Sequence, residues 1–225
     1  MSRWRGLVDA VSEADGALRF GEAAVDCDEL VEWLLRHQVL TGRDAGLFRP
    51  TAEDFEERRL PTGERLKTKL ATTQTMSQEA ARILHAMSAG SREVEDAVAR
   101  TAARLGETCY ALQHCTIGEC AASFVGYMRF LRGTLGDASA PEMTWRLQTL
   151  SEHRDGKGRW KRFPTYYTVL VLSEIDLPAA RDELVYAAPI WSSPARAAST
   201  EEPYARRRSR LQSDLESRGL GPRAR

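Results

Sequence analysis

Apolar side chains recur at three- and four-residue steps along most of the chain, and this spacing predicts a mainly α-helical fold. At the N-terminus, one helical face carries Trp4, Leu7, Val8 and Val11, and Gly16 follows them. Because glycine favours the position after the last helical turn, we expect this first helix to end at Gly16.

Residues 1–60 are predicted to form a small unit of their own. After the first helix, residues 18–20 alternate apolar and polar side chains, which predicts a short strand. Asp26, an acidic N-cap, begins a helix for which Gly42 is the expected stop, and an extended piece follows at residues 47–49. This order is typical of a winged-helix-like module, and the Pro, Thr and Gly at residues 61–63 mark its boundary.

Residues 64–190 are predicted to form a second unit made of stacked helical hairpins. Gly90, Pro141, Pro164 and Pro178 separate short amphipathic segments, and each proline suits the first turn of a helix. A single short hairpin cannot bury its apolar face alone, so we expect the hairpins to pack side by side.

Two further segments complete this organisation. Residues 166–175 are apolar almost throughout, so we expect a helix that is buried on most sides. Their β-branched members leave a central strand as the alternative. Residues 191–225 are rich in Ala, Ser, Pro and Arg and are expected to form a linker and an Arg-rich tail.

The segment Asp155-Gly156-Lys157-Gly158-Arg159-Trp160, followed by Tyr166-Tyr167-Thr168, resembles one repeat of the α/α toroids of terpene cyclases and protein prenyltransferases. In that family a D-G-x-G-x-W-like turn leads into an inner helix, so the resemblance implies a helical hairpin here. The catalytic D-x-D-D motif of the cyclases has no equivalent. The nearest string, residues 26–29, ends in Glu and lies at a predicted helix start, where acids cap the helix.

Charge is distributed unevenly along a chain whose total is neutral, with 32 basic and 32 acidic residues. Residues 1–60 hold 13 acidic residues against 8 arginines, a local charge of −5. Residues 153–162 hold five basic residues against one acidic residue, and residues 206–225 hold seven against two. Such asymmetry steers a charged partner, or it lets two parts of the molecule neutralise one another.

The basic segment at residues 153–163 is the predicted partner-binding site because it mixes cations with aromatic rings. Its candidate contact residues are Arg154, Lys157, Arg159, Trp160, Lys161 and Arg162. We expect this loop to bind a protein, a second copy of this chain included. The alternative partner is a nucleic acid, held by this loop and by the arginines of residues 206–210. In a purely structural alternative, Trp160 packs at the base of the hairpin and its basic neighbours stay in water.

Cys109, Cys115 and Cys120, with His114 among them, are the most suggestive group for chemistry. On one continuous helix Cys109 and Cys120 would stand about 16 Å apart, because each residue rises ~1.5 Å. No single helix could therefore chelate an ion with them, whereas a break at Gly118 would bring them together.

We expect these cysteines to pack in the core, as buried cysteines commonly do. One alternative is a metal site at Cys109, His114, Cys115 and Cys120, since zinc takes four N or S ligands. A second alternative is a reactive thiol with a histidine as its base. More distant residues that could complete a metal site are Cys27, His37 and His85, and the candidate bases are His114 and His153.

Common enzyme signatures are missing from the sequence. It has no G-x-S-x-G elbow, no phosphate-binding G-x-x-x-x-G-K-[ST] loop, no G-x-G-x-x-G and no H-E-x-x-H. We therefore predict no catalytic residue and no cofactor. With no apolar run that fits a membrane span or a secretion signal, we expect a cytoplasmic, non-enzymatic interaction or regulatory protein. A nucleic-acid-associated protein and an enzyme that uses the Cys/His group are the alternatives.

Overall fold

The computed structural model describes residues 3–198 and 200–221, and its regular structure is helical. The helices are α1 (Leu7–Phe20), α2 (Cys27–His37), α3 (Ala52–Glu57), α4 (Lys69–Ser88), α5 (Arg92–Gly106), α6 (Cys109–Leu112), α7 (Cys120–Leu135), the 3-10 helix η1 (Gly136–Ser139), α8 (Ala140–Ser151), α9 (Thr165–Ser173), α10 (Pro178–Trp191), α11 (Pro194–Ala197) and α12 (Tyr204–Ser217). The described residues contain isolated β-bridges but no β-strand. The predicted mainly α fold is confirmed.

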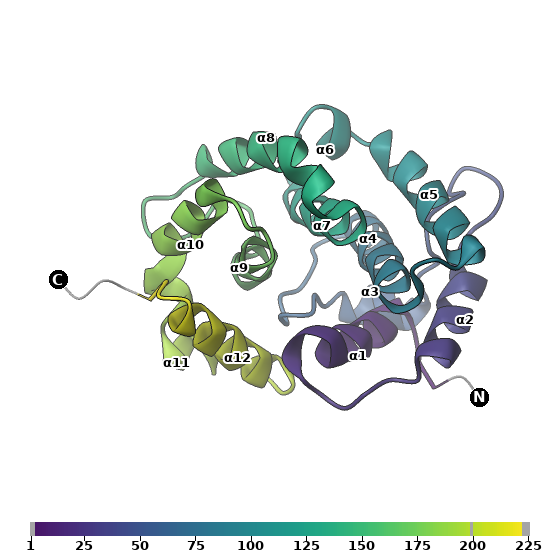
Figure 1. The fold of residues 1–225 in the computed structure, drawn as a ribbon, viewed down its shortest axis with the longest axis horizontal. Coiled ribbons are helices and arrows are strands. Elements are labelled where there is room, and N and C mark those ends of the chain that lie inside the picture. The colour runs from purple at the N-terminus through teal and green to yellow at the C-terminus, as the bar shows by residue number, and fades with distance from the viewer. Residues whose placement is uncertain (1–2, 199, 222–225) are drawn as a thin grey trace.

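Helix α9 lies in the interior, with α1, α4, α7, α8, α10 and α12 arranged around it (Figure 1). It contacts α7, α10 and α12, and every residue from Tyr166 to Ser173 is buried. A helix covered on all sides needs no polar face, which explains the unbroken apolar run in the sequence. The predicted buried helix is thus confirmed over these residues, and the alternative of a central strand is wrong.

Two helices in this arrangement have their first amides capped by carboxylates from distant parts of the chain. Asp54 accepts hydrogen bonds from the amides of Leu7 and Val8, at 2.9 and 2.7 Å, at the start of α1. Glu64 accepts from the amides of Tyr166 and Tyr167 in the first turn of α9, at 2.7 and 2.9 Å. Each carboxylate also complements the helix dipole, so these two acids fix where α1 and α9 begin.

Five charged side chains meet in the interior and are called here the Arg129 cluster. They are Asp15 of α1, Glu79 and Arg82 of α4, Arg129 of α7 and Glu174 at the end of α9. The Arg129 guanidinium lies 2.9 Å from an Asp15 oxygen, 3.1 Å from a Glu79 oxygen and 2.7 Å from a Glu174 oxygen. Because four of these charges are buried and Glu174 is half-buried, each of them depends on its partners.

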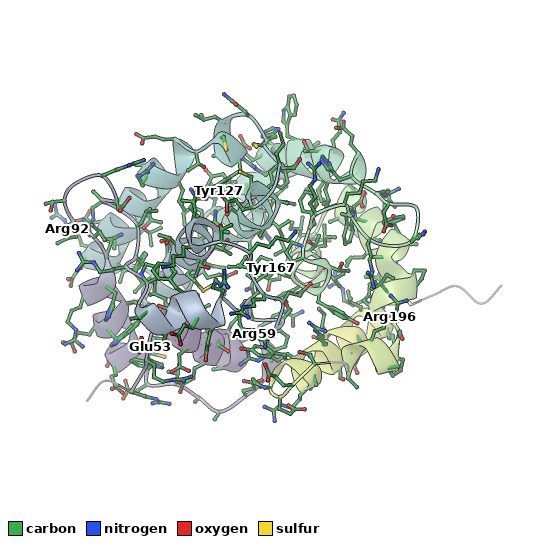
Figure 2. All side chains as sticks on the ribbon, turned by 180° about the vertical axis from the view of Figure 1, so that it is seen from behind. Glu53, Arg59, Arg92, Tyr127, Tyr167 and Arg196 are labelled. Carbon is green, nitrogen blue, oxygen red and sulfur yellow. The ribbon has the colours of Figure 1, made fainter. Side chains whose placement is uncertain are left out.

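The protonation states of the Arg129 cluster follow from this pairing. Burial alone would raise the pKa of Asp15, but Arg129 and Arg82 bring it down to about 2. Burial likewise works against the charge on Arg129, yet its three carboxylate neighbours raise its pKa well above the usual value. The Tyr167 hydroxyl, in the middle of the molecule in Figure 2, donates a hydrogen bond to Glu79. The ion pairs therefore favour the charged forms of Asp15 and Arg129 despite their burial.

The strand expected at residues 18–20 is wrong, because these residues form the last turn of α1. The helix continues through Gly16 and ends at Gly21, whose φ of 63° is the left-handed conformation that glycine adopts readily. Gly16 instead allows a close approach: a Cβ there would lie 2.2 Å from Glu22 and 2.8 Å from Arg207. The structure therefore lacks the strand that the predicted winged-helix-like order includes.

The turn at residues 61–63 does not separate two cores in the described structure. Its three residues are buried, and one hydrophobic core extends from Trp4 to Leu220. The Arg129 cluster also crosses the expected boundary, since Asp15 pairs with Arg82 and Arg129. Residues 1–60 and 64–190 therefore share one interior.

The linker and tail expected at residues 191–225 are wrong for much of that segment. Residue 199 and residues 222–225 lie outside the described part of the chain, but α11 and α12 occupy most of the rest. Arg207 is buried, with its guanidinium 2.7 Å from Glu22, and Arg208 donates to the carbonyl of Thr62 at 2.8 Å. Buried partners on the N-terminal region thus hold these arginines in an ordered helix.

No helix in the described residues combines the length and apolar character that crossing a bilayer requires.

We predict that Arg129→Ala lowers the free energy of unfolding by about 3–5 kcal/mol, because the change leaves Asp15 and Glu79 buried beside an incomplete set of cations. Urea denaturation of the two proteins measures this difference. The matched control is Arg36→Ala, which removes an exposed i,i+4 pair with Glu32 and should cost less than about 0.5 kcal/mol. Equal effects of the two substitutions would contradict a structural role for the cluster.

Candidate metal centre

Three cysteines meet in a loop, called here the thiol loop, that covers residues 109–120. Helix α6 begins at Cys109, α7 begins at Cys120, and Cys115 lies in the irregular segment between them. The chain turns at Gly118, whose φ of 58° is left-handed. The predicted break at Gly118 is therefore present, and it brings together two cysteines that one helix would hold apart.

The three Sγ atoms lie within 4.8 Å of one another, and those of Cys109 and Cys120 are 3.6 Å apart. A disulfide would need about 2.05 Å, so this pair is not bonded. Sulfur ligands on a tetrahedral zinc ion, each at ~2.3 Å, stand roughly 3.8 Å from one another. The observed spacing is thus close to that of a thiolate metal site, and small side-chain rotations would complete it.

Backbone contacts hold the thiol loop in this shape. The carbonyl of Cys109 accepts hydrogen bonds from the amide of Gln113 at 2.9 Å and from that of Cys115 at 3.3 Å. The amide of Cys120 donates to the carbonyl of Ile117 at 3.1 Å. These contacts close the loop on both sides of Cys115, so the three thiols are brought together by the backbone itself.

The three cysteines lie at the edge of the core, and the expected core packing holds only for Cys120, which packs against it. Cys109 is exposed, whereas Cys115 and Cys120 are half-buried. Cys27, the fourth cysteine, is exposed on α2, and it is not part of the group of thiols. Neither Cys27 nor His37 nor His85 belongs to the cluster, so none of these distant residues completes it. His114, the fourth residue of the predicted metal site, also lies outside this group of ligand atoms in the structure.

The thiols differ in acidity. A hydrogen bond from the amide of Ile117 lowers the pKa of Cys115, with a further contribution from its two thiol neighbours. Burial raises the pKa of Cys120 to about 12, and its contacts with Cys109 and Cys115 act in the same direction. Cys115 is therefore more readily ionised than Cys120.

The two histidines near the thiol loop have different surroundings. His153 is fully engaged, because Nε2 lies 2.8 Å from the Thr116 hydroxyl and Nδ1 lies 2.8 Å from the Thr149 carbonyl. The ring of His114 instead packs edge-on against Trp145, with ring centroids 5.4 Å apart. Burial, followed by the charge of Arg146, lowers the pKa of His114. His153 is thus a structural residue here rather than the base for a thiol.

Large apolar side chains flank the thiol loop on its solvent side. Leu112 is 68% exposed, Ile117 is 70% exposed, and Trp145 is 62% exposed. The sequence places Trp145 among the apolar residues of its helix, but it stands two positions before the buried Leu147 and so faces away from the core. This two-residue spacing from Leu147 is the sequence signal that identifies Trp145 as a surface residue.

The basic loop, residues 153–163, is only partly the surface that the sequence predicts. Trp160 is buried and donates from Nε1 to Glu183 at 2.7 Å, so the expectation that its ring meets a partner is wrong. Arg154 is committed to the same carboxylate at 2.8 Å. The other four candidates, Lys157, Arg159, Lys161 and Arg162, are exposed. Trp160 and Arg154 are held in the structure by Glu183 on α10. The carboxylate of Glu183 is buried, so it needs both of these side chains as partners.

The arginines at residues 206–210 are not a free basic tail either. Arg207 and Arg208 are buried, and their guanidinium groups face residues of the N-terminal region. Arg206 and Arg210 each form an ion pair with a carboxylate, Glu22 and Asp214 respectively. This segment therefore offers little unpaired positive charge to a phosphate backbone.

Comparison with protein families, with curated proteins and with solved structures found no match to this chain. The resemblance of residues 155–170 to a toroid repeat consequently stays a prediction, and the assignment of function depends on the geometry described above.

We predict that iodoacetamide alkylates Cys115 before Cys120 at pH 7–8, because the lowered pKa of Cys115 gives it the larger thiolate fraction. Peptide mass spectrometry after short labelling times measures the order. Labelling of the metal-free protein in which Cys120 leads, or in which both thiols react together, would contradict this assignment.

Proposed function

We propose that this chain is a metal-binding protein that holds a thiophilic ion, with Zn²⁺ as the best fit, between the thiolates of Cys109, Cys115 and Cys120. One observation carries the proposal: the three Sγ atoms lie within 4.8 Å of one another at one surface of the fold. Thiolate sulfur is a soft ligand, and it selects zinc, copper(I) and related ions over magnesium or calcium.

Electrostatics supports a cation at this position. Three thiolates within 4.8 Å repel one another, and a divalent ion between them removes that repulsion. The backbone contacts of the thiol loop already hold the three residues together, so ion binding orders few additional groups. A largely preformed site binds its ion with a smaller entropic cost than a disordered one.

The position of the site supports a regulatory role over a purely structural one. The ion would lie at the surface, next to exposed Cys109, whereas the Arg129 cluster is made of other residues and Cys120 alone of the three ligands packs against the hydrophobic core. The fold therefore contains stabilising interactions that do not depend on the metal. We infer a protein that responds to bound metal.

We predict that the reduced full-length chain binds one Zn²⁺ and that Cys115→Ser lowers the affinity by more than about 100-fold, since it removes a direct ligand. Competition with a chromophoric zinc chelator measures affinity, and elemental analysis of the dialysed protein measures stoichiometry. The matched control is Cys27→Ser, which removes an exposed thiol outside the cluster and should leave both values unchanged.

Bound Co²⁺ gives a second readout of the same site, because thiolate-to-cobalt charge transfer appears only when sulfur is coordinated. These absorption bands should be present in the wild type and in Cys27→Ser and should weaken in each of the three cluster variants. Zinc binding that persists undiminished in Cys109→Ser, Cys115→Ser and Cys120→Ser, or no binding in the wild type, would overturn the proposal.

A second candidate function is binding of an acidic protein surface by the basic loop. The observation in its favour is that Lys157, Arg159, Lys161 and Arg162 are exposed, with no carboxylate at ion-pair distance in the described part of the chain. Burial of Trp160 removes the aromatic platform that single-stranded nucleic acid would use, which favours the protein partner.

The positive surface extends beyond the basic loop. Arg162 lines a pocket of about 250 Å³ together with Arg65 and Lys67. Of the two carboxylates in its wall, Glu64 caps α9 and Glu119 accepts a hydrogen bond from a threonine hydroxyl. The cations of this pocket therefore add to the charge that a partner meets.

We predict that the triple substitution of Arg159, Lys161 and Arg162 by Glu weakens binding of poly-glutamate at least 10-fold, because it reverses the charge of the loop. Fluorescence anisotropy at two salt concentrations measures the affinity and its expected decrease with salt. Arg92→Glu, an exposed change on α5, is the control. Tighter binding of a single-stranded oligonucleotide than of poly-glutamate would contradict the choice of partner.

A further inference from the structure

The thiol site provides three ligands, whereas a tetrahedral ion takes four. Water, a partner molecule or a fourth side chain of this chain can occupy the remaining position. Three side chains of suitable type lie on or next to the thiol loop, namely His114, Glu119 and His153. The three side chains differ in whether a hydrogen bond already occupies the atom that would bind the ion.

Glu119 and His153 are already engaged. The carboxylate of Glu119 accepts a hydrogen bond from the Thr68 hydroxyl at the start of α4. Both ring nitrogens of His153 have partners, the Thr116 hydroxyl and the Thr149 carbonyl, each at 2.8 Å. Either residue would have to give up a hydrogen bond before it could bind an ion, and His153 would also leave its place in the structure.

His114 is the side chain that is available. Its ring nitrogens form no hydrogen bond with any described residue, and its contacts are edge-on packing against Trp145 and Phe124 at 5.4 and 6.2 Å. The ring is only partly buried. To bind an ion it would give up aromatic contacts and no hydrogen bond.

The backbone of His114 is strained. Its φ of 50° is left-handed, a conformation that is unfavourable for a residue with a Cβ. The amides on both sides, of Gln113 and Cys115, donate to the single carbonyl of Cys109. His114 therefore occupies the tip of a tight turn directly before a thiol ligand, where glycine would be less strained.

We propose that His114 is the fourth ligand of the ion held by Cys109, Cys115 and Cys120, and that metal binding draws its imidazole away from Trp145. The inference rests on the proposed metal function. It adds a ligand from the same turn as Cys115, so that a Cys₃His site replaces a three-thiol site. It also couples the occupancy of the site to the surroundings of an exposed tryptophan.

Two measurements on the full-length chain test the ligand assignment. We expect His114→Ala to lower Zn²⁺ affinity roughly 10- to 100-fold while one ion still binds, because water takes the vacant position. The d–d bands of the Co²⁺ complex should shift, since an oxygen ligand replaces nitrogen. The matched control is His85→Ala, which removes a histidine outside the cluster and should leave affinity and spectrum unchanged.

Tryptophan fluorescence tests the predicted movement. Trp145 is 62% exposed, whereas Trp4, Trp33, Trp160 and Trp191 are all buried, so a change at the surface is reported mainly by Trp145. Addition of Zn²⁺ should change the emission of the wild type. The change should be lost in Trp145→Phe, which still binds the ion, and in His114→Ala at saturating Zn²⁺.

The outcomes separate the inference from the proposed function. Unchanged Zn²⁺ affinity and an unchanged Co²⁺ spectrum in His114→Ala would overturn the role of His114, while the three-cysteine site would stand if the cysteine variants still lose the ion. Absence of metal binding in the wild type would overturn both. A weaker affinity with a shifted Co²⁺ spectrum, together with loss of the Trp145 signal, supports the inference.

Discussion

The pairing of Arg129 with Asp15, Glu79 and Glu174 is the interaction on which the arrangement of this molecule depends. Charges that are almost fully buried cannot be left without partners, so α1, α4, α7 and the end of α9 must meet at one place. This constraint joins the N-terminal helix to the rest of the molecule. It also orients α7, whose first residue is Cys120, and so fixes one side of the thiol loop. The interior and the candidate metal centre are thereby linked through a single helix.

Much of the helical structure could be predicted from local signals. The N-cap Asp26 and the helix-starting Pro141 and Pro178 depend on residues within one turn, and the structure has a helix starting at each of them. The buried helix α9 was predictable as well, because a helix covered on all sides leaves an unbroken apolar run. These features need no knowledge of what lies across the fold.

Contacts between distant residues set the limit of prediction. Gly16 has the appearance of a helix end, but Glu22 and Arg207 determine its role by approaching it closely. The many arginines of residues 206–225 predict a mobile tail. In the structure, however, Arg207 binds Glu22 and Arg208 binds the carbonyl of Thr62. Trp160 is buried because Glu183 lies beside it on another helix. For the thiols, the sequence supplied the break at Gly118, whereas only the folded loop shows that the cysteines face one another at the edge of the core.

X-ray absorption at the zinc edge of the purified, zinc-loaded chain tests the central claim, a thiolate metal centre, most directly because it reads the atoms around the ion. A Cys₃His site predicts three sulfur neighbours at about 2.3 Å and one nitrogen neighbour at about 2.0 Å. A first shell made only of oxygen and nitrogen would show that the ion is bound elsewhere and would contradict the account.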